Sequence, residues 1–320
     1  MKIDTHNHAI PPATVELLRR EKVYKSEVRD NRIIVAANPI FDLIDSFLTA
    51  KGKLAELERC GLEAAVVSSS PTLFYYDVDA AAGEAMARTV NQGLVEMCAE
   101  APERLKWMAT VPMQAPEVAV TVLEDAIKAG AVGVEVGTSI AGGRLDEARF
   151  EPFWAAAERS GLPVMLHPAF NEPSAALEPF YLTNVIGNLL ETTITVERLI
   201  SRGVLDRHPG VRLLLVHAGG YFPFQAGRLK HARTVREELK DSPTDPWQYV
   251  GRQLLFDVVT HDVQALRYLV SRLGVDSIVM GTDLPFDMAM TDAVKMLEEA
   301  TDAATAERIT EANPAALFGF

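Results

Sequence analysis

Short runs of apolar and β-branched residues recur eight times along this chain of 320 residues, and each is followed by a segment with helical spacing. Runs that are continuous, rather than alternating with polar residues, are typical of parallel strands covered on both faces. Segments such as 79–101 and 115–129 carry apolar positions three and four residues apart, which predicts amphipathic helices. We therefore expect strands at residues 3–8, 64–70, 105–112, 131–138, 162–168, 211–217, 254–260 and 277–283.

Eight strand–helix units predict an α/β fold, a (β/α)8 TIM barrel, with a doubly wound sheet as the alternative. The sequence contains no linker or low-complexity tract, so residues 1–320 are predicted to form a single domain. A segment of about residues 10–51, after the first strand, falls outside the repeating pattern. Its 24–34 portion alternates charged and β-branched residues, which predicts a small hairpin inserted over the barrel mouth.

The net charge of -13 argues against a surface that binds nucleic acid or an anionic membrane. It is compatible with an anionic substrate, because a few cations placed in a pocket outweigh a diffuse surface charge. Two cysteines are too few for a disulfide framework, and the N-terminus lacks the apolar stretch of a signal peptide. No window reaches the roughly 18 apolar residues that a spanning helix needs. We predict a soluble, cytoplasmic protein.

Ionisable side chains gather where the predicted strands end. His6 and His8 close the first strand and share one face of it, because side chains alternate along a strand. His167, His217 and Asp283 close the fifth, sixth and eighth strands. A barrel brings the carboxyl ends of its strands together around one axis, at the face where barrel enzymes carry their chemistry. These five side chains are therefore predicted to converge.

Three imidazoles and one carboxylate suit a single divalent ion such as zinc, with one coordination position open for water. Mixed imidazole and carboxylate ligation also accommodates manganese. Such an ion lowers the pKa of its water toward neutrality, and a fourth imidazole nearby is available to transfer protons. Any one of these residues has an ordinary structural explanation. The metal site is preferred because four of the seven histidines fall at predicted strand ends.

Other ionisable residues lie within the strands or beyond them. Glu135 interrupts an apolar run in the fourth strand, where an unpaired carboxylate is costly to bury. It therefore either faces the barrel interior near the ion or pairs with a core cation. His261 follows the seventh strand at the same rim and is a candidate for substrate contact. His208 in a polar turn is predicted to be structural, and His231 after a helical segment is predicted to be a surface residue.

At these residues the sequence resembles the amidohydrolase superfamily, and within it the branch typified by α-amino-β-carboxymuconate-ε-semialdehyde decarboxylase. The resemblance is carried by residues 3–8, 165–168, 217–224, 227–228 and 281–286, in that order. It implies a (β/α)8 barrel with one divalent metal ion. It also implies that the ion is held by His6, His8, His167 and Asp283, and that His217 activates the metal-bound water.

The resemblance assigns substrate-binding roles as well. Arg228, which taken alone would be a solvated arginine near the start of a helix, matches a position that reaches into the partner subunit's site and binds a substrate carboxylate. This implies a homodimer. Family decarboxylases also carry substrate-binding arginines in the segment after the first strand, where this chain has Arg29 and Arg32. The fourth strand has no lysine to bridge two metals, which favours one ion, although Glu135 could substitute.

The expected activity is metal-dependent, non-oxidative decarboxylation of a small unsaturated or aromatic carboxylic acid, with His217 and Asp283 as catalytic residues. The ion and Arg228 would orient the substrate, and His217 would return a proton to carbon after CO2 leaves. Hydrolysis or hydration by the same metal hydroxide is the alternative, and His261 would offer it a second proton carrier. A binding or scaffold protein without chemistry is disfavoured by the complete ligand set.

Overall fold

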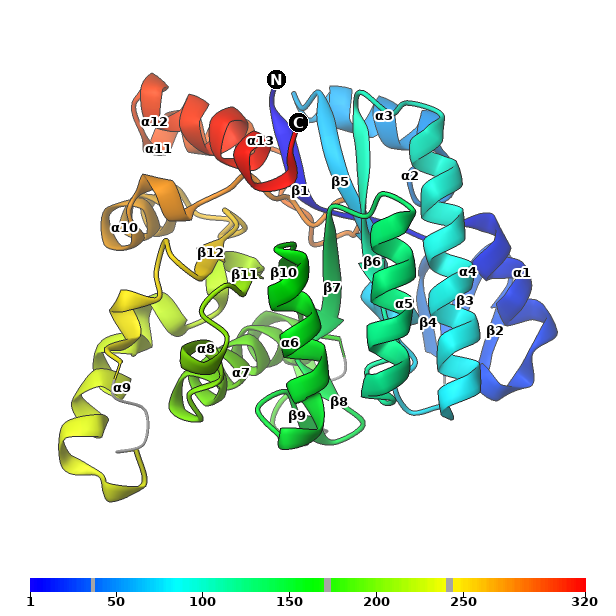
Figure 1. The fold of residues 1–320 in the computed structure, drawn as a ribbon. Helices are drawn as coiled ribbons and strands as arrows, with labels where there is room; N and C mark the ends of the chain where they lie inside the picture. The colour runs from blue at the N-terminus through cyan, green and yellow to red at the C-terminus, as the bar shows by residue number, and fades with distance from the viewer. Residues whose placement is uncertain (36–37, 170–173, 240–243) are drawn as a thin grey trace.

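The computed structural model describes residues 1–35, 38–169, 174–239 and 244–320. Its centre is a curled sheet of parallel strands, and each neighbour in the sheet is the next barrel strand along the chain (Figure 1). This order is that of a barrel wound in one direction. The strands in sheet order are β1 (Ile3–Ala9), β5 (Ala64–Ser69), β6 (Leu105–Thr110), β7 (Gly133–Gly137), β10 (Pro163–His167), β11 (Arg212–Leu215) and β12 (Leu254–Phe256).

The predicted eighth strand differs from the other seven. This stretch makes isolated bridges instead of a continuous ladder: Ile278 pairs with Phe256 of β12, and Leu284, one residue beyond the predicted strand, pairs with Asn7 of β1. Asp283 interrupts the extended conformation, because its φ of 67° lies in the left-handed region. The segment still joins the last strand to the first. The predicted barrel fold is therefore confirmed, and only its eighth strand is reduced to single bridges.

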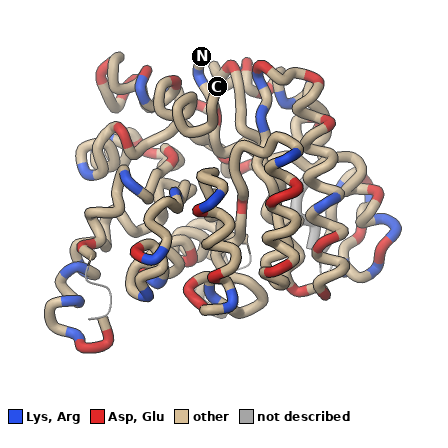
Figure 2. Tube along the Cα trace, viewed as in Figure 1, with Lys and Arg blue, Asp and Glu red and all other residues tan. Residues whose placement is uncertain are grey.

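Helices cover the outside of the sheet, and the predicted helices at 79–101 and 115–129 are present as α4 and α5 (Figure 1). Charged residues lie mostly on these helices and the loops, with both signs intermingled, while the strands are largely free of them (Figure 2). Within the described ranges, no helix is long and apolar enough to cross a membrane. The covering helices are α3 (Ala50–Arg59), α4 (Ala80–Ala99), α5 (Pro116–Lys128), α6 (Glu151–Ser160), α7 (Leu189–Ser201), α8 (Val204–Arg207), α9 (Phe222–Val235), α10 (Val263–Leu273), α11 (Ala293–Ala300), α12 (Ala303–Glu307) and α13 (Asn313–Phe318).

The segment after β1 adds a small sheet to the barrel. The predicted hairpin is present as β2 and β3, and a third strand, β4, was not predicted. Tyr24 packs against Tyr75 with ring centroids 5.0 Å apart, and the hydroxyls of Ser26 and Tyr75 are hydrogen-bonded at 2.6 Å. These contacts place the sheet beside the loop that follows β5. The elements of this segment are α1 (Pro12–Arg20), β2 (Ser26–Arg29), β3 (Arg32–Val35), β4 (Asn38–Asp42) and α2 (Asp45–Leu48).

Alternation along the strands divides the apolar core into an inner and an outer group. The outer group, with residues such as Val67 and Leu166, packs the strands against the helices. Phe318 of α13 belongs to the inner group, and its carbonyl accepts a hydrogen bond from Lys106 near the start of β6. The C-terminal helix thus closes the barrel at the end where the strands begin. The inner group comprises Val66, Met108, Met165, Leu214, Val216, Leu255, Val279 and Phe318.

A buried carboxylate ties β1 to the closing segment. Asp4 is fully buried, and its Oδ1 accepts a hydrogen bond from the backbone NH of His6 at 3.1 Å. Its Oδ2 accepts from Asn7 Nδ2 at 2.7 Å and from the Thr282 hydroxyl at 2.5 Å. Burial raises the pKa of Asp4 to about 6 although these three donors oppose the shift. The same residue therefore fixes the strand that carries the first two histidines and the end of the barrel.

We expect Asp4→Ala to lower the free energy of unfolding by on the order of 3 kcal/mol, because buried donors lose their acceptor. Urea unfolding of the metal-free and metal-loaded protein would measure the change. Thr282→Val removes only one of the three donors and should cost about 1 kcal/mol. Equal stability of the Asp4→Ala variant and the parent would contradict this role.

Candidate metal centre

A bulge in β1 spreads two histidine rings apart. The pairing of β1 with β5 shifts register between Asp4 and Asn7, which inserts one extra residue on the β1 side. The His6 and His8 rings have centroids 5.0 Å apart and an interplanar angle of 84°. The strand end is held by Lys53 of α3, whose buried Nζ donates to the His8 carbonyl at 2.6 Å. The two rings consequently approach one point from different directions.

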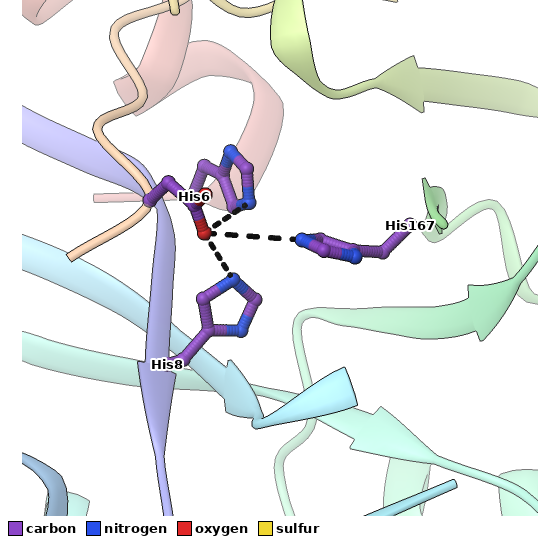
Figure 3. Close-up of side chains that lie close together, drawn as sticks. His6, His8 and His167 are labelled. Atoms are coloured by element: carbon purple, nitrogen blue, oxygen red, sulfur yellow. Dashed lines mark ion pairs between the residues drawn. The ribbon is translucent and has the colours of Figure 1, made fainter. Parts of the chain in front are cut away.

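Four of the predicted residues meet at that point. His6 Nε2 lies 3.3 Å, His8 Nε2 3.1 Å and His167 Nε2 3.9 Å from the same oxygen, Oδ1 of Asp283. Figure 3 shows the three rings directed at this carboxylate. One ligand atom from each of the four residues lies within 4.8 Å of the others, and all four residues are buried. The predicted convergence of these side chains is confirmed.

The other ring nitrogen of each histidine has a hydrogen-bond acceptor. His6 Nδ1 lies 2.7 Å from Oδ2 of Asp257, His8 Nδ1 2.9 Å from the carbonyl of Ser69, and His167 Nδ1 2.7 Å from the carbonyl of Pro168. An acceptor at Nδ1 places the proton there and leaves Nε2 with a free lone pair. This arrangement is the usual one for histidines that bind a metal.

The Nε2 atoms of these histidines differ from Nδ1 in their surroundings. In the described part of the chain, Nε2 of His6, His8 and His167 and Oδ1 of Asp283 are all buried and unsatisfied. Burial lowers the pKa of His8 to about 4 and that of His167 to about 3, so both rings are neutral near pH 7. Neutral imidazoles and unsatisfied lone pairs around one carboxylate fit a divalent cation.

Asp283 is the negative charge of the centre. Its burial alone would raise the carboxyl pKa, but the surrounding imidazoles, His6 foremost, hold that pKa well below its ordinary value. His6 differs from the other two rings: burial alone would lower its pKa, but the carboxylates of Asp283 and Asp257 raise it. A divalent cation would bind this ring in its neutral form.

His217 lies beside the other oxygen of the same aspartate. Its Nε2 is 3.3 Å from Asp283 Oδ2, and its ring centroid is 5.2 Å from that of His167. His217 and Ala218 have φ values of 53° and 55°, so the chain turns sharply after β11. The buried Nδ1 of His217 has no hydrogen-bond partner among the described residues. One ring nitrogen of His217 is therefore engaged by Asp283, and the other by no described residue.

Asp257, a residue not predicted from the sequence to belong to the site, connects His6 with the turn at His217. Its Oδ2 accepts from His6 Nδ1 and from the backbone NH of His217, and its Oδ1 accepts from the backbone NH of Ala218. Burial would raise the pKa of Asp257, but the hydrogen bond and charge of His6 hold it below its ordinary value. At Gly281 a Cβ atom would come within 2.8 Å of the Cβ atoms of both His6 and Asp257, so only glycine fits there. A polar residue inside the apolar run 254–259 was the available signal.

Glu135 faces the barrel interior, the first of the two predicted positions. Its neighbours Val134 and Val136 belong to the outer apolar group, which directs Glu135 inward. Oε1 lies 3.7 Å from His8 Nδ1, and neither oxygen has a hydrogen-bond partner within the described ranges. Burial raises the pKa of Glu135 well above its ordinary value. The residue lies behind the His8 ring and is not one of the four grouped ligands.

Two cavities open onto the centre, and His217, Asp283, Asn184 and Met288 line both. The larger has a volume of about 450 Å3 and the smaller about 270 Å3. The walls of the larger cavity come from the segments that follow β10, β11 and β12 and from residues 283–288. We call the larger cavity the large lobe and the smaller cavity the small lobe. Such volumes are typical of sites for small molecules.

The predicted substrate-binding residues are not all found together. His261 lines the large lobe. Arg32 pairs with Asp42 on the small sheet, Arg29 is exposed, and neither lines a lobe. Arg228 is exposed on α9 and makes no hydrogen bond or ion pair with the described residues. The substrate roles of these residues remain predictions.

A barrel with three imidazoles and one aspartate around a single point defines the class of metal-dependent barrel enzymes. The amidohydrolase family profile matches residues 3–320. The chain therefore belongs to the amidohydrolase family. It is 27% identical over 316 residues to the 2-amino-3-carboxymuconate-6-semialdehyde decarboxylase of Dictyostelium discoideum, covering 94% of this chain and 88% of the relative. It is 30% identical over 226 residues to the gamma-resorcylate decarboxylase of Rhodococcus jostii, covering 63% of this chain and 67% of the relative.

Solved structures share the fold over its whole length. The apo form of IDCase from Metarhizium anisopliae has a TM-score of 0.90 at 24% identity, covering 100% of this chain and 97% of that one. A dihydroxybenzoic acid decarboxylase from Polaromonas sp. JS666, solved with manganese and 2-nitroresorcinol, has a TM-score of 0.81 at 23% identity, covering 99% and 96%. The chain is an enzyme of this family, and decarboxylation is favoured over hydrolysis.

We expect Asp257→Asn to weaken metal binding by about 10- to 100-fold, because an amide cannot serve all the donors that face the carboxylate. Competition with a chromophoric chelator would measure the affinity. Asp262→Asn is a matched control in the same loop, since Asp262 only caps α10 and asparagine is an equally good cap. Unchanged metal affinity in the Asp257→Asn variant would show that the carboxylate does not position His6.

Proposed function

We propose that this protein is a metal-dependent, non-oxidative decarboxylase of an unsaturated or aromatic carboxylic acid. The observation that carries the proposal is the set of buried, unsatisfied ligand atoms beside His217, all opening onto one cavity system. The decarboxylase relatives support the reaction class. Hydrolysis remains the alternative, because the same ligands would serve it.

His6, His8, His167 and Asp283 would hold one divalent ion, zinc or manganese. The hydrogen bonds at Nδ1 of the three histidines fix the rings before the ion arrives, so little reorganisation is needed on binding. When bound, the ion supplies positive charge that orients the substrate and stabilises the electrons left behind by CO2. Zinc suits three imidazoles and one carboxylate, and manganese is the metal in the Polaromonas structure.

His217 would move the proton. The bond between the carboxylate carbon and its neighbouring carbon breaks, the electron pair stays on the neighbouring carbon, and a proton must replace CO2. His217 lines both lobes and is 12% exposed, so its ring can reach a substrate carbon or a water molecule in the cavity next to Asp283. Asp283 Oδ2, at 3.3 Å, orients the ring and stabilises it when it is protonated.

We further propose a homodimer in which Arg228 binds the substrate carboxylate in the partner's site. In its own subunit Arg228 lines neither lobe. Exposed apolar side chains lie around the entrance to the two lobes, as expected of an interface. They are Phe180, Tyr181, Val185, Phe224 and Tyr268, and Phe224 is 78% exposed.

Metal-loaded protein in D2O should release CO2 from a panel of hydroxybenzoates and unsaturated acids, with one deuterium replacing each lost carboxylate. His217→Gln should keep its metal and lose about 10²- to 10⁴-fold in kcat, because general acid–base catalysis contributes about that much. Mass spectrometry of the product and metal analysis of the protein would follow both effects.

The exposed His231 on α9 provides the control, and His231→Gln should leave kcat and metal content unchanged. Solvent ¹⁸O in the product without CO2 release would favour hydrolysis or hydration. No turnover of any acid by fully metallated protein would count against both activities.

The role of Arg228 can be tested by mixing inactive subunits. His217→Gln and Arg228→Ala should each be inactive alone. Co-expression should restore about one quarter of the parent activity, because half of randomly formed dimers are mixed and each contains one intact site. Arg233→Ala, further along α9, is the matched control and should stay active. If co-expression restores nothing, Arg228 does not act across subunits.

A further inference from the structure

The charge on the walls of the two lobes limits which acids can bind. The large lobe is lined mainly by apolar and aromatic side chains, among them Val259, Leu269 and Phe224. Apart from Asp283 and the histidines His217 and His261, the polar residues that line it, such as Thr260, carry no charge. Of the described residues, no lysine or arginine lines either lobe. The only other charged residue is Asp287, which is negative and lines the small lobe.

The arginines expected from the inserted segment do not change this balance. Arg32 is neutralised by Asp42 on the small sheet, and Arg29 is exposed. Among the residues outside the described ranges, 36–37 and 170–173 include no lysine or arginine, and 240–243 include one cation, Lys240. Within one subunit the described residues therefore place no cation at the lobes, so a bound divalent ion would supply the positive charge there, joined on the proposed dimer by the partner subunit's Arg228.

Both cations belong to the same carboxylate. The two positive charges of a divalent ion would already be matched by the carboxylate of Asp283 and by that of Asp257, which lies 2.7 Å from Nδ1 of His6. The leaving carboxylate must lie between the ion and His217, and the proposed role of the partner subunit's Arg228 is to bind that group. A second carboxylate on the substrate would lie in the apolar part of the large lobe or near Asp287. There it would lose hydration without gaining a cation.

We propose that the substrate is a monocarboxylate whose unsaturated or aromatic body is uncharged and occupies the large lobe. This inference rests on the proposed decarboxylase function and adds the charge of the substrate to it. Thr260 and Asn184 can hydrogen-bond to a neutral hydroxyl, carbonyl or amide on that body, and His261 at the rim offers a further ring nitrogen. Dicarboxylic acids are excluded by their second charge and not by their size.

The test compares 2-hydroxybenzoates that differ only in charge. Each carries either a second carboxylate or a carboxamide of the same shape, placed para to the first carboxylate or para to the hydroxyl. Dissociation constants are measured by calorimetry on the metal-loaded protein at pH 7.5, where the second carboxylate is ionised. In at least one of the two positions, the carboxamide should bind at least about tenfold more tightly than the matching dicarboxylate. In the other position, the dicarboxylate should not bind more tightly than the carboxamide.

A cation placed at the junction of the lobes should remove this preference. Met288 lines both lobes and is only half-buried, so Met288→Arg can be accommodated and would provide the missing partner. We expect the ratio of the two dissociation constants to fall in this variant. Met288→Gln, of similar length and uncharged, should leave the ratio as in the parent.

Tighter binding of a dicarboxylate in either position, or equal binding of the dicarboxylate and the carboxamide in both positions, would overturn the inference, and so would failure of every probe to bind. CO2 release from the same compounds is recorded separately. If the carboxamides bind selectively and no acid is decarboxylated under any condition, the proposed reaction is wrong and the charge selectivity of the cavity stands.

Discussion

The site depends on one buried carboxylate oxygen, Oδ1 of Asp283, that faces the Nε2 atoms of three histidines. Each histidine has an acceptor for Nδ1, so each presents at Nε2 a lone pair to which no described residue donates. Four unsatisfied polar atoms in one buried space are costly for a folded protein. A divalent cation removes that cost, so ligand binding and stability are linked at this centre.

The same residues that hold the centre also close the barrel. Asp4 joins β1 to the segment that carries Asp283, and Asp257 joins His6 to the backbone of His217. Gly281 allows these groups to approach, because any side chain there would collide with them. Distortion of the eighth strand is therefore a consequence of the site: the turn at Asp283 that interrupts the ladder is the turn that aims its carboxylate inward.

The strands and the metal ligands are predictable from the sequence, because both leave a recognisable pattern in short stretches of residues. Continuous apolar runs identify buried parallel strands, and polar residues at their carboxyl ends must meet in a barrel. Asp257 was missed because it lies inside an apolar run rather than at its end, although Glu135 was noticed for that very reason. The third strand of the insertion and the pairing of Arg32 with Asp42 depend on contacts between segments, which periodicity does not report.

The division between centre and walls explains why ligands alone do not define the substrate. The ligand atoms come from strand ends, whose positions are fixed by the sheet, whereas the lobes are walled by the segments that follow β5, β10, β11 and β12 and by residues 283–288. Wall residues can change without disturbing the hydrogen bonds that orient the histidines. The reaction class therefore follows from the centre, while the charge and shape of the acid follow from the walls. A cavity wall without a cation can select against a second carboxylate as strongly as a wall with a cation selects for one. The reason is that burying an unpaired carboxylate costs more free energy than losing one favourable contact.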